Sequence, residues 1–178
     1  MDLGVISVRY ARALLKSAVE MKKEQQVYQE MQTLLKAYID VPQLRTTIDN
    51  PMLEKEKKAE LLHTACGGQV TPLTRRFIAL VLQEGRESTL QFMAASYITL
   101  YRKQKNITRG KLITAAAVSP ETEEKMKRMV ESRTQGTVEF QTEVNPDIIG
   151  GFILEYDTYR MDASVKNKLH SILNTLKK

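Results

Sequence analysis

The 178-residue sequence has few of the side chains that usually carry chemistry: one cysteine, two histidines and no tryptophan. Because Cys66 is the only cysteine, no intrachain disulfide can form, which suits a reducing compartment. His63 lies three residues before Cys66, but two ligands do not make a zinc site and no second pair is present. Both residues are therefore interpreted as structural. The alternative, a Cys–His nucleophile pair, is disfavoured because Cys66 stands directly before Gly67-Gly68, where a helix is expected to end.

The short motifs through which enzymes hold nucleotides or nucleophiles are also missing. The sequence contains no G-x-x-x-x-G-K-[ST], no G-x-G-x-x-G and no G-x-S-x-G. Its carboxylates are scattered through helical segments among basic neighbours, which is typical of a solvated surface. We therefore predict a protein without a catalytic site, a cofactor or a bound metal.

Long apolar runs are absent too. No stretch approaches the ~18 apolar residues that a membrane-spanning helix needs. The first twenty residues contain an early acidic residue and no long apolar run, so they do not form a signal peptide. We expect a soluble protein that reaches a membrane only through its partners, without direct insertion.

Charge is unevenly distributed along the chain. The net charge is +6, and residues 1–105 hold sixteen basic and eleven acidic side chains against eleven and ten in residues 106–178. A basic excess of this size suits nucleic acid, an acidic membrane surface or an acidic protein partner. No block of five like charges is present, and an RNA-binding sheet would need a run of stacking aromatics beyond Phe140 and Phe152. Because of the basic excess, a basic nucleic-acid-binding adaptor remains the alternative function, although these two features of such proteins are missing.

The first 105 residues have the apolar spacing of helices. Apolar side chains recur at intervals of three and four residues, and no β-type alternation of useful length interrupts them. Between these runs stand the breakers Pro42, Asn50-Pro51, Gly67-Gly68, Pro72 and Gly85. The pattern predicts about six helices, two of them short, in an antiparallel bundle.

After Lys105 the pattern changes to that of a small α+β domain. The expected elements, in order, are a strand over 112–118, a helix capped by Ser119, a strand over 137–144, a strand over 148–156, a short strand over 159–161 and a helix capped by Ser164. The fold class predicted is thus mainly α: an N-terminal six-helix bundle (1–105) followed by a small α+β domain (106–178), with the change near residues 103–111.

Two features of this second domain need an explanation. Gly150 and Gly151 fall inside the expected strand 148–156, where glycine weakens pairing unless another backbone must approach closely. The glycines could serve packing against the domain's own helix, which we favour, or against a partner. The last helix is expected to present the apolar stripe Val165, Leu169, Ile172, Leu173 and Leu176.

The first helix has more apolar surface than one buried side requires. On a helical wheel Val8, Ala11, Leu15, Ala18 and Val19 form one apolar face, and a second face adjoins it, so that the two cover about two-thirds of the circumference. The small residues Ala13 and Ser17 beside Tyr10 favour a groove that admits another helix. The alternative is a helix surrounded by its own bundle. The candidate partner-binding residues, from the first and fifth helices, are Ile6, Tyr10, Ala13, Leu14, Phe77, Leu80 and Val81.

The stretch "NPDIIGGFILEYDTYRMDASVKNKL" resembles the C-terminal signature of the delta subunit of the bacterial F-type ATP synthase, whose mitochondrial relative is the oligomycin-sensitivity-conferring protein. "RYARALLKSA" is similar to the opening helix of that family and "LVLQEGRESTL" to the exit of its fifth helix. Ala163 stands where the family usually has glycine, which suggests that this turn does not need a positive φ. The residues that match the C-terminal motif are Pro146, Gly150, Gly151, Asp162, Ser164, Val165 and Leu169.

The resemblance implies a non-catalytic subunit of the peripheral stalk. On that basis, residues 1–105 would bind N-terminal helices of the alpha subunits on the catalytic head. Residues 106–178 would hold the C-terminal ends of the b subunits, and the linkage would resist rotational torque during ATP synthesis. The resemblance also implies a peripheral location at the cytoplasmic face of the bacterial cell membrane, with no cofactor and no nucleic acid.

Overall fold

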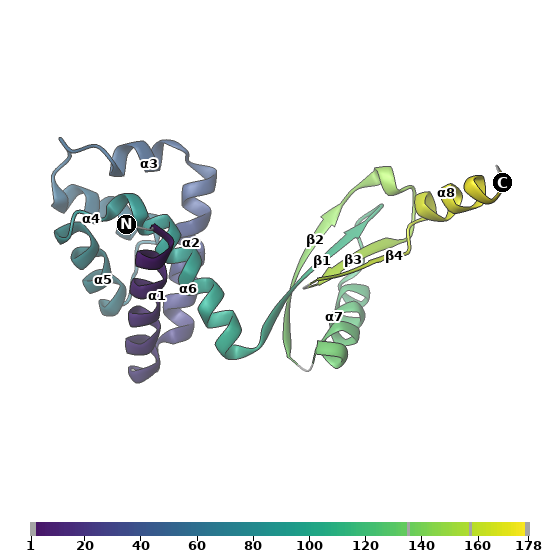
Figure 1. Cartoon of the computed structure of the whole chain (residues 1–178), viewed down its shortest axis with the longest axis horizontal. Helices are drawn as coiled ribbons and strands as arrows, with labels where there is room; N and C mark the ends of the chain where they lie inside the picture. The colour runs from purple at the N-terminus through teal and green to yellow at the C-terminus, as the bar shows by residue number, and fades with distance from the viewer. Residues whose placement is uncertain (1–2, 135, 157, 177–178) are drawn as a thin grey trace. The chain divides into compact units, whose positions relative to one another are not determined.

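The computed structural model describes residues 3–134, 136–156 and 158–176. The chain is mainly helical, with a small mixed sheet of four strands in its C-terminal part (Figure 1). It divides into two compact units between Lys103 and Gln104.

The first unit is built from helices. Its elements are α1 (Leu3–Glu20), α2 (Glu24–Asp40), α3 (Gln43–Ile48), α4 (Lys55–Ala65), α5 (Pro72–Gln83), the 3-10 turn η1 (Glu87–Thr89) and α6 (Leu90–Lys105). Each longer helix contributes an apolar face to the core, and Met31, Ile78 and Tyr97 are completely or almost completely buried. The three- and four-residue spacing of apolar side chains therefore corresponds to helices, as predicted, because it places one face of each helix in the core.

Two buried polar contacts fix the helices of this unit relative to one another. The Glu30 carboxylate on α2 accepts hydrogen bonds from the Thr71 backbone NH, 2.5 Å away, and from the hydroxyls of Thr71 and Thr74 at the start of α5. On α4, the Lys58 ammonium donates to Glu87 of η1 at 2.7 Å, and its side chain is only 4% exposed. Both contacts link segments that are far apart in the sequence, so they fix the packing that apolar contacts alone would leave looser.

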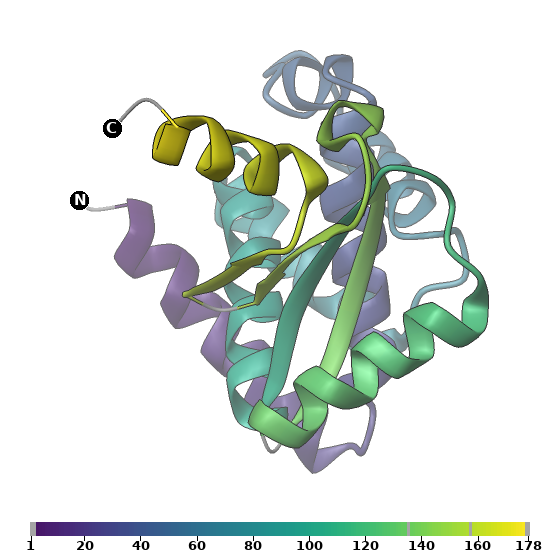
Figure 2. The same ribbon diagram turned by 90° about the vertical axis from the view of Figure 1, so that its right-hand side faces the viewer.

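The second unit is a four-stranded sheet with two helices. Its elements are β1 (Ile107–Thr114), α7 (Pro120–Thr134), β2 (Thr137–Val144), the 3-10 turn η2 (Pro146–Ile148), β3 (Phe152–Tyr156), β4 (Tyr159–Asp162) and α8 (Val165–Leu176). The strand order is β2-β1-β3-β4, with β1 and β2 parallel and the other pairs antiparallel. Figure 2 shows α7 against one face of the sheet, while α8 leaves from the end of β4.

The core of the second unit lies between α7 and the sheet. Leu112, Val130, Val138 and Leu154 are almost fully buried there. Phe140 and Phe152 are partly buried and pack against this cluster. The Phe140 ring lies over Gly110 of the neighbouring strand, where a Cβ atom would come within 2.8 Å of it. Both phenylalanines are therefore core residues rather than free stacking surfaces.

The structure corrects two of the expected strands. β1 begins at Ile107 instead of 112 and ends at Thr114, because its pairing with both neighbours stops there. The expected strand 148–156 begins only at Phe152, because Ile149 and Gly151 have φ values of 69° and 73°, which extended chain cannot adopt. The paired glycines thus precede the strand instead of interrupting it. The strand 137–144 and the helix cap at Ser119 are confirmed.

Candidate functional site

A groove of about 360 Å³ runs between α1 and α5. Its surface is mainly apolar, with one arginine contributed by each helix. Apolar grooves with a few polar groups are the usual form of sites that bind another molecule. The residues that line it are Arg9, Tyr10, Ala13, Leu14, Ser17, Leu73, Arg76, Phe77 and Leu80.

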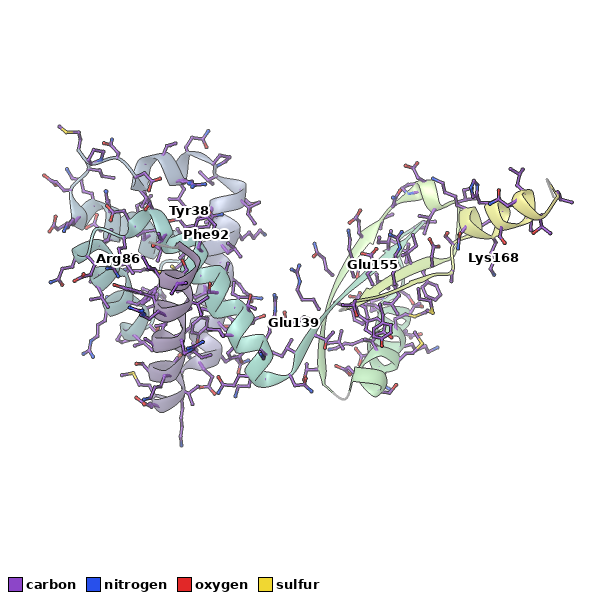
Figure 3. All side chains as sticks on the ribbon, viewed as in Figure 1. Tyr38, Arg86, Phe92, Glu139, Glu155 and Lys168 are labelled. Carbon is purple, nitrogen blue, oxygen red and sulfur yellow. The ribbon has the colours of Figure 1, made fainter. Side chains whose placement is uncertain are left out.

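Tyr10 forms one wall of the groove and is held in place on two sides. The Arg86 guanidinium donates a hydrogen bond of 2.7 Å to the Tyr10 hydroxyl and also lies over the tyrosine ring, 5.3 Å from its centre. The edge of Tyr10 meets the Phe77 ring of α5, with ring centres 6.5 Å apart. Arg86, labelled in Figure 3, comes from the turn after α5. The wall is therefore ordered before any partner arrives.

The predicted partner-binding residues fall into three groups. Tyr10, Ala13 and Leu80 line the groove and are reachable, with Ala13 and Leu80 exposed. Leu14 and Phe77 line it from below and are mostly buried in the core. Ile6 is half-buried and lies outside the lining. Val81 is 0% exposed and does not line the groove, so its side chain supports α5 from inside instead of offering a contact surface.

Sequence reasoning missed three lining residues: Arg9, Leu73 and Arg76. A signal for Leu73 was present, since Leu73, Phe77 and Leu80 follow the four- and three-residue spacing of one helical face. Apolar spacing gave no signal for Arg9, but an arginine can border an apolar groove along its methylene stem.

The exposed side of α1 shows that the other described helices of its unit do not surround it. Ala11, Leu14, Leu15 and Ala18 form its buried face. Outside this face Val5, Val8 and Val19 are exposed. A second hollow of about 730 Å³ adjoins the groove along α1, where apolar side chains stand beside Arg9, Arg12 and Lys16. The surplus apolar surface indicated by the helical wheel is therefore present.

The second unit offers a different apolar surface, the stripe along α8. No described residue of α8 is buried, and side chains extend outward along the helix in Figure 3, where Lys168 is labelled. Single exposed apolar residues are common, but a continuous stripe of them usually marks an interaction site. The exposed members are Val165, Leu169, Ile172, Leu173 and Leu176.

Gly150 and Gly151 form the joint that holds the start of α8. A Cβ atom on Gly151 would lie 2.3 Å from the Ala163 carbonyl oxygen, and one on Gly150 would lie 3.1 Å from a Val165 methyl. The Val165 NH donates to the Gly150 carbonyl at 2.9 Å. The glycines thus serve packing against the domain's own helix. Pro146 begins the η2 turn that leads into this joint.

Asp162 and Ser164 complete the joint as a helix cap. An Asp162 oxygen accepts hydrogen bonds from the Ser164 NH at 3.0 Å and the Ser164 hydroxyl at 2.6 Å, and the Ser164 oxygen accepts from the Asn167 NH. The hydrogen bonds from Ser164 hold the pKa of the Asp162 carboxyl below its usual range. Ala163 has no positive φ, as its departure from the family's glycine suggested. Six of the seven motif residues therefore build this joint, and the seventh, Leu169, lies on the α8 stripe.

The two side chains considered as a Cys–His nucleophile pair are poorly suited to that role. Burial raises the pKa of the Cys66 thiol to about 12, which leaves it protonated and unreactive at neutral pH. Burial also lowers the pKa of nearby His63, so this side chain stays neutral. Among residues 3–134, 136–156 and 158–176, no group of three His, Cys, Asp or Glu side chains could hold a metal ion. Within the same residues, no helix has the length and apolar character to cross a membrane.

The open face of the sheet does not resemble a nucleic-acid site. Lys111 lies 2.7 Å from Glu143, and Arg160 lies 3.4 Å from Glu155, so both of these cations are matched by carboxylates, while Arg109 donates to the Gln141 side chain. The aromatic side chains Phe140 and Phe152 belong to the core on the side of α7.

A helical unit with an apolar groove, joined to a small sheet domain with an exposed apolar helix, has the surfaces of a protein that binds partners. The model of the family described as ATP synthase delta (OSCP) subunit matches residues 6–176. The ATP synthase subunit delta of Phocaeicola vulgatus is 47% identical over 97% of this chain and 94% of its own length. That of Bacteroides fragilis is 40% identical with the same coverage.

The chain therefore belongs to the ATP synthase delta (OSCP) subunit family. Membership of this family makes it a non-catalytic subunit of the ATP synthase stator, which replaces the alternative of a nucleic-acid adaptor. A chain in the cryo-EM structure of the Toxoplasma gondii mitochondrial ATP synthase hexamer shares the fold, with a TM-score of 0.66 at 20% identity and 97% of each chain covered.

Proposed function

We propose that the groove between α1 and α5 binds an N-terminal helix of an alpha subunit on the catalytic head. The observation that carries this proposal is the groove itself, whose floor of Leu14 and Phe77 is fixed by the core while Ala13 and Leu80 remain open at its rim. A helix laid into such a groove covers apolar surface at three- and four-residue intervals. Because Ala13 and Ser17 are small, the backbone of the incoming helix can approach α1 closely.

The α8 stripe is the proposed contact for the C-terminal ends of the b subunits. The stripe runs along one helix and is covered by nothing within the described residues. A second helix laid against it would bury Leu169, Ile172 and Leu173 together. The joint at Gly151 and Asp162 fixes the direction in which α8 leaves the sheet. It would thereby also set the direction of a b-subunit helix packed along α8.

With one partner at each unit, the chain links the catalytic head to the membrane-anchored stalk. Such a linkage resists the torque that the turning shaft applies to the head during ATP synthesis. The chain would then lie at the membrane surface, on the cytoplasmic face in a bacterium, held there by the complex.

The substitution Ala13→Asp tests the groove in the full-length chain. A carboxylate placed at the rim must lose water against an apolar helix, so the affinity for a synthetic alpha N-terminal peptide should fall at least about tenfold. The melting temperature of the free protein should stay nearly unchanged, because Ala13 is exposed before the partner binds. Calorimetric titration and a thermal melt measure the two quantities.

Ala79→Asp is the matched control. Ala79 is exposed on α5 beside Leu80 but does not line the groove, so the same substitution there should leave the peptide affinity near that of the parent. A folded Ala13→Asp variant that binds the peptide as tightly as the parent would remove this groove from the interface. If Ala13→Asp unfolds the free unit, the position belongs to the core and the assignment is wrong as well.

A further inference from the structure

Helices α1 and α5 carry most of the basic excess of the first unit. Together they hold five basic side chains and only one acidic one, Glu20. The rest of residues 1–105 is almost balanced, with eleven basic and ten acidic side chains. The basic residues of the two helices are Arg9, Arg12, Lys16, Arg75 and Arg76. The positive charge is thus concentrated on the two helices that form the groove.

Two of these cations border the groove itself, Arg9 from α1 and Arg76 from α5. Both are exposed, and within the described part of the chain neither forms an ion pair or a side-chain hydrogen bond. Two other cations of this unit have structural roles, because Arg86 donates to the Tyr10 hydroxyl and Lys58 pairs with Glu87. Toward the described residues, the two groove arginines therefore keep their side-chain hydrogen-bond donors available.

A purely apolar helix would make poor use of this arrangement. When it covers the groove it removes water from beside Arg9 and Arg76 without supplying an acceptor, which costs free energy. A helix with carboxylates beside its apolar stripe would supply acceptors in that position, and a guanidinium can donate two parallel hydrogen bonds to one carboxylate. The same opposite charges would also speed the encounter and fix the register of the helix in the groove.

We propose that the groove selects an acidic amphipathic helix, with apolar side chains on the floor and carboxylates at the edges facing Arg9 and Arg76. This inference rests on the proposed function, because it specifies the chemistry of the helix that the groove receives. The proposed ligand is thus a protein segment, and binding of nucleic acid is tested as the competing result.

The test measures fluorescence anisotropy of a labelled alpha N-terminal peptide bound to the full-length chain. One peptide has the natural sequence, and in the other every Asp and Glu is replaced by Asn and Gln. We expect the second peptide to bind about tenfold more weakly at low salt, since each exposed ion pair contributes up to about a fivefold change. Raising the salt concentration should weaken the natural peptide and bring the two affinities together.

Substitutions in the protein assign the effect to the two arginines. Arg9→Gln and Arg76→Gln should each weaken the natural peptide about threefold while leaving the neutral peptide nearly unchanged, which is the signature of direct coupling in a double-mutant cycle. Lys36→Gln is the matched control, because Lys36 is exposed on α2 and does not line the groove. It should change neither affinity.

Three outcomes would overturn the inference, and they separate it from the proposed function. Equal binding of both peptides shows that the groove captures its helix by apolar contact alone, so the proposed function stands and the acidic partner does not. Binding of neither peptide removes both proposals. A single-stranded RNA of equal net charge that binds as tightly as the natural peptide shows a general polyanion surface instead of a selective groove.

Discussion

The two units expose apolar surface in opposite ways. In the first, Leu14 and Phe77 belong both to the core and to the groove, so the residues that fold the unit also shape the proposed binding site. In the second, no described residue of α8 is buried, and the start of the helix is held by the hydrogen bond from the Val165 NH to the Gly150 carbonyl. A groove made by the core is ready before binding, whereas an uncovered helix gains its packing only from the partner. Substitutions should therefore separate stability from binding differently in the two units.

The largest effect on stability is expected at the joint of α8. Gly151→Ala must place a Cβ atom where φ is 73° and the Ala163 carbonyl oxygen lies 2.3 Å away, so the backbone has to move. Conformational strain and overpacking together should cost about 4 kcal/mol. We expect α8 to detach and stalk binding to be lost, while the first unit melts as in the parent. Hydrogen exchange resolved by segment would show the change.

Gly68→Ala is the control for the strained backbone alone. Gly68 has a φ of 81°, but nothing lies within 4 Å of an added Cβ atom. It should cost only about 1 kcal/mol. If Gly151→Ala is no worse than Gly68→Ala, close packing at the joint is not what holds α8.

The next effect concerns the ion pair that fixes the first unit. Lys58→Ala leaves the Glu87 carboxylate, 18% exposed, without its partner at 2.7 Å, and breaking a pair of this kind should cost about 3 kcal/mol. Lys57→Ala removes the adjacent lysine, whose bond to Glu54 is fully at the surface, and should change stability by less than about 0.5 kcal/mol. Urea unfolding of the first unit compares the two. Equal losses would mean that burial of Lys58 has no energetic consequence.

A smaller effect should appear as a pH dependence. Burial alone would raise the pKa of the Glu87 carboxyl, but hydrogen bonds from Lys58 and the backbone outweigh burial and lower that pKa overall. A lowered folded-state pKa stabilises the protein above the unfolded value of about 4.3, and this stabilisation disappears as the pH falls through the folded value. Glu87→Gln should therefore destabilise the first unit at pH 7 and approach the parent near pH 3. A stability difference that stays constant between pH 7 and pH 3 would contradict this.

The two units also differ in how much of their structure could be predicted from the sequence. The helices of the first unit are predictable from the spacing of their apolar side chains. Tyr10, Ala13 and Leu80 could be assigned to a groove because they lie outside the core faces of α1 and α5. Arg9 and Arg76 could not, since an arginine at a groove and an arginine in solvent have the same spacing.

In the second unit the order of elements was predictable, but the glycines were misplaced. A run of apolar residues over 148–156 predicts a strand, and only tertiary contact with Ala163 and Val165 explains why the backbone turns at Ile149 and Gly151. The start of β1 was missed because Arg109, Gly110 and Lys111 do not look like a buried strand, although Arg109 pairs with β2 and the other two residues pair with both β2 and β3. The start of this strand depends on its pairing with distant segments, which the local pattern does not show.

The smallest effect on the free protein is expected along α8, and it is the sharpest test of the comparison. Leu169 and Ile172 are 52% and 57% exposed, so Leu169→Ser and Ile172→Ser should each change the melting temperature by less than about 2 °C. Binding to a purified b-subunit fragment should nevertheless fall about tenfold or more for the double variant, because each side chain would be buried only in the complex. Lys168→Ser, directly before Leu169 in the sequence and exposed on the same helix, is the control and should bind nearly as well as the parent. In the first unit the analogous truncation, Phe77→Ala, should lower stability and peptide binding together, since Phe77 is both core and groove floor. If the α8 variants melt as early as Phe77→Ala, the stripe is part of a folded core, and the contrast between a preformed groove and an uncovered helix is wrong.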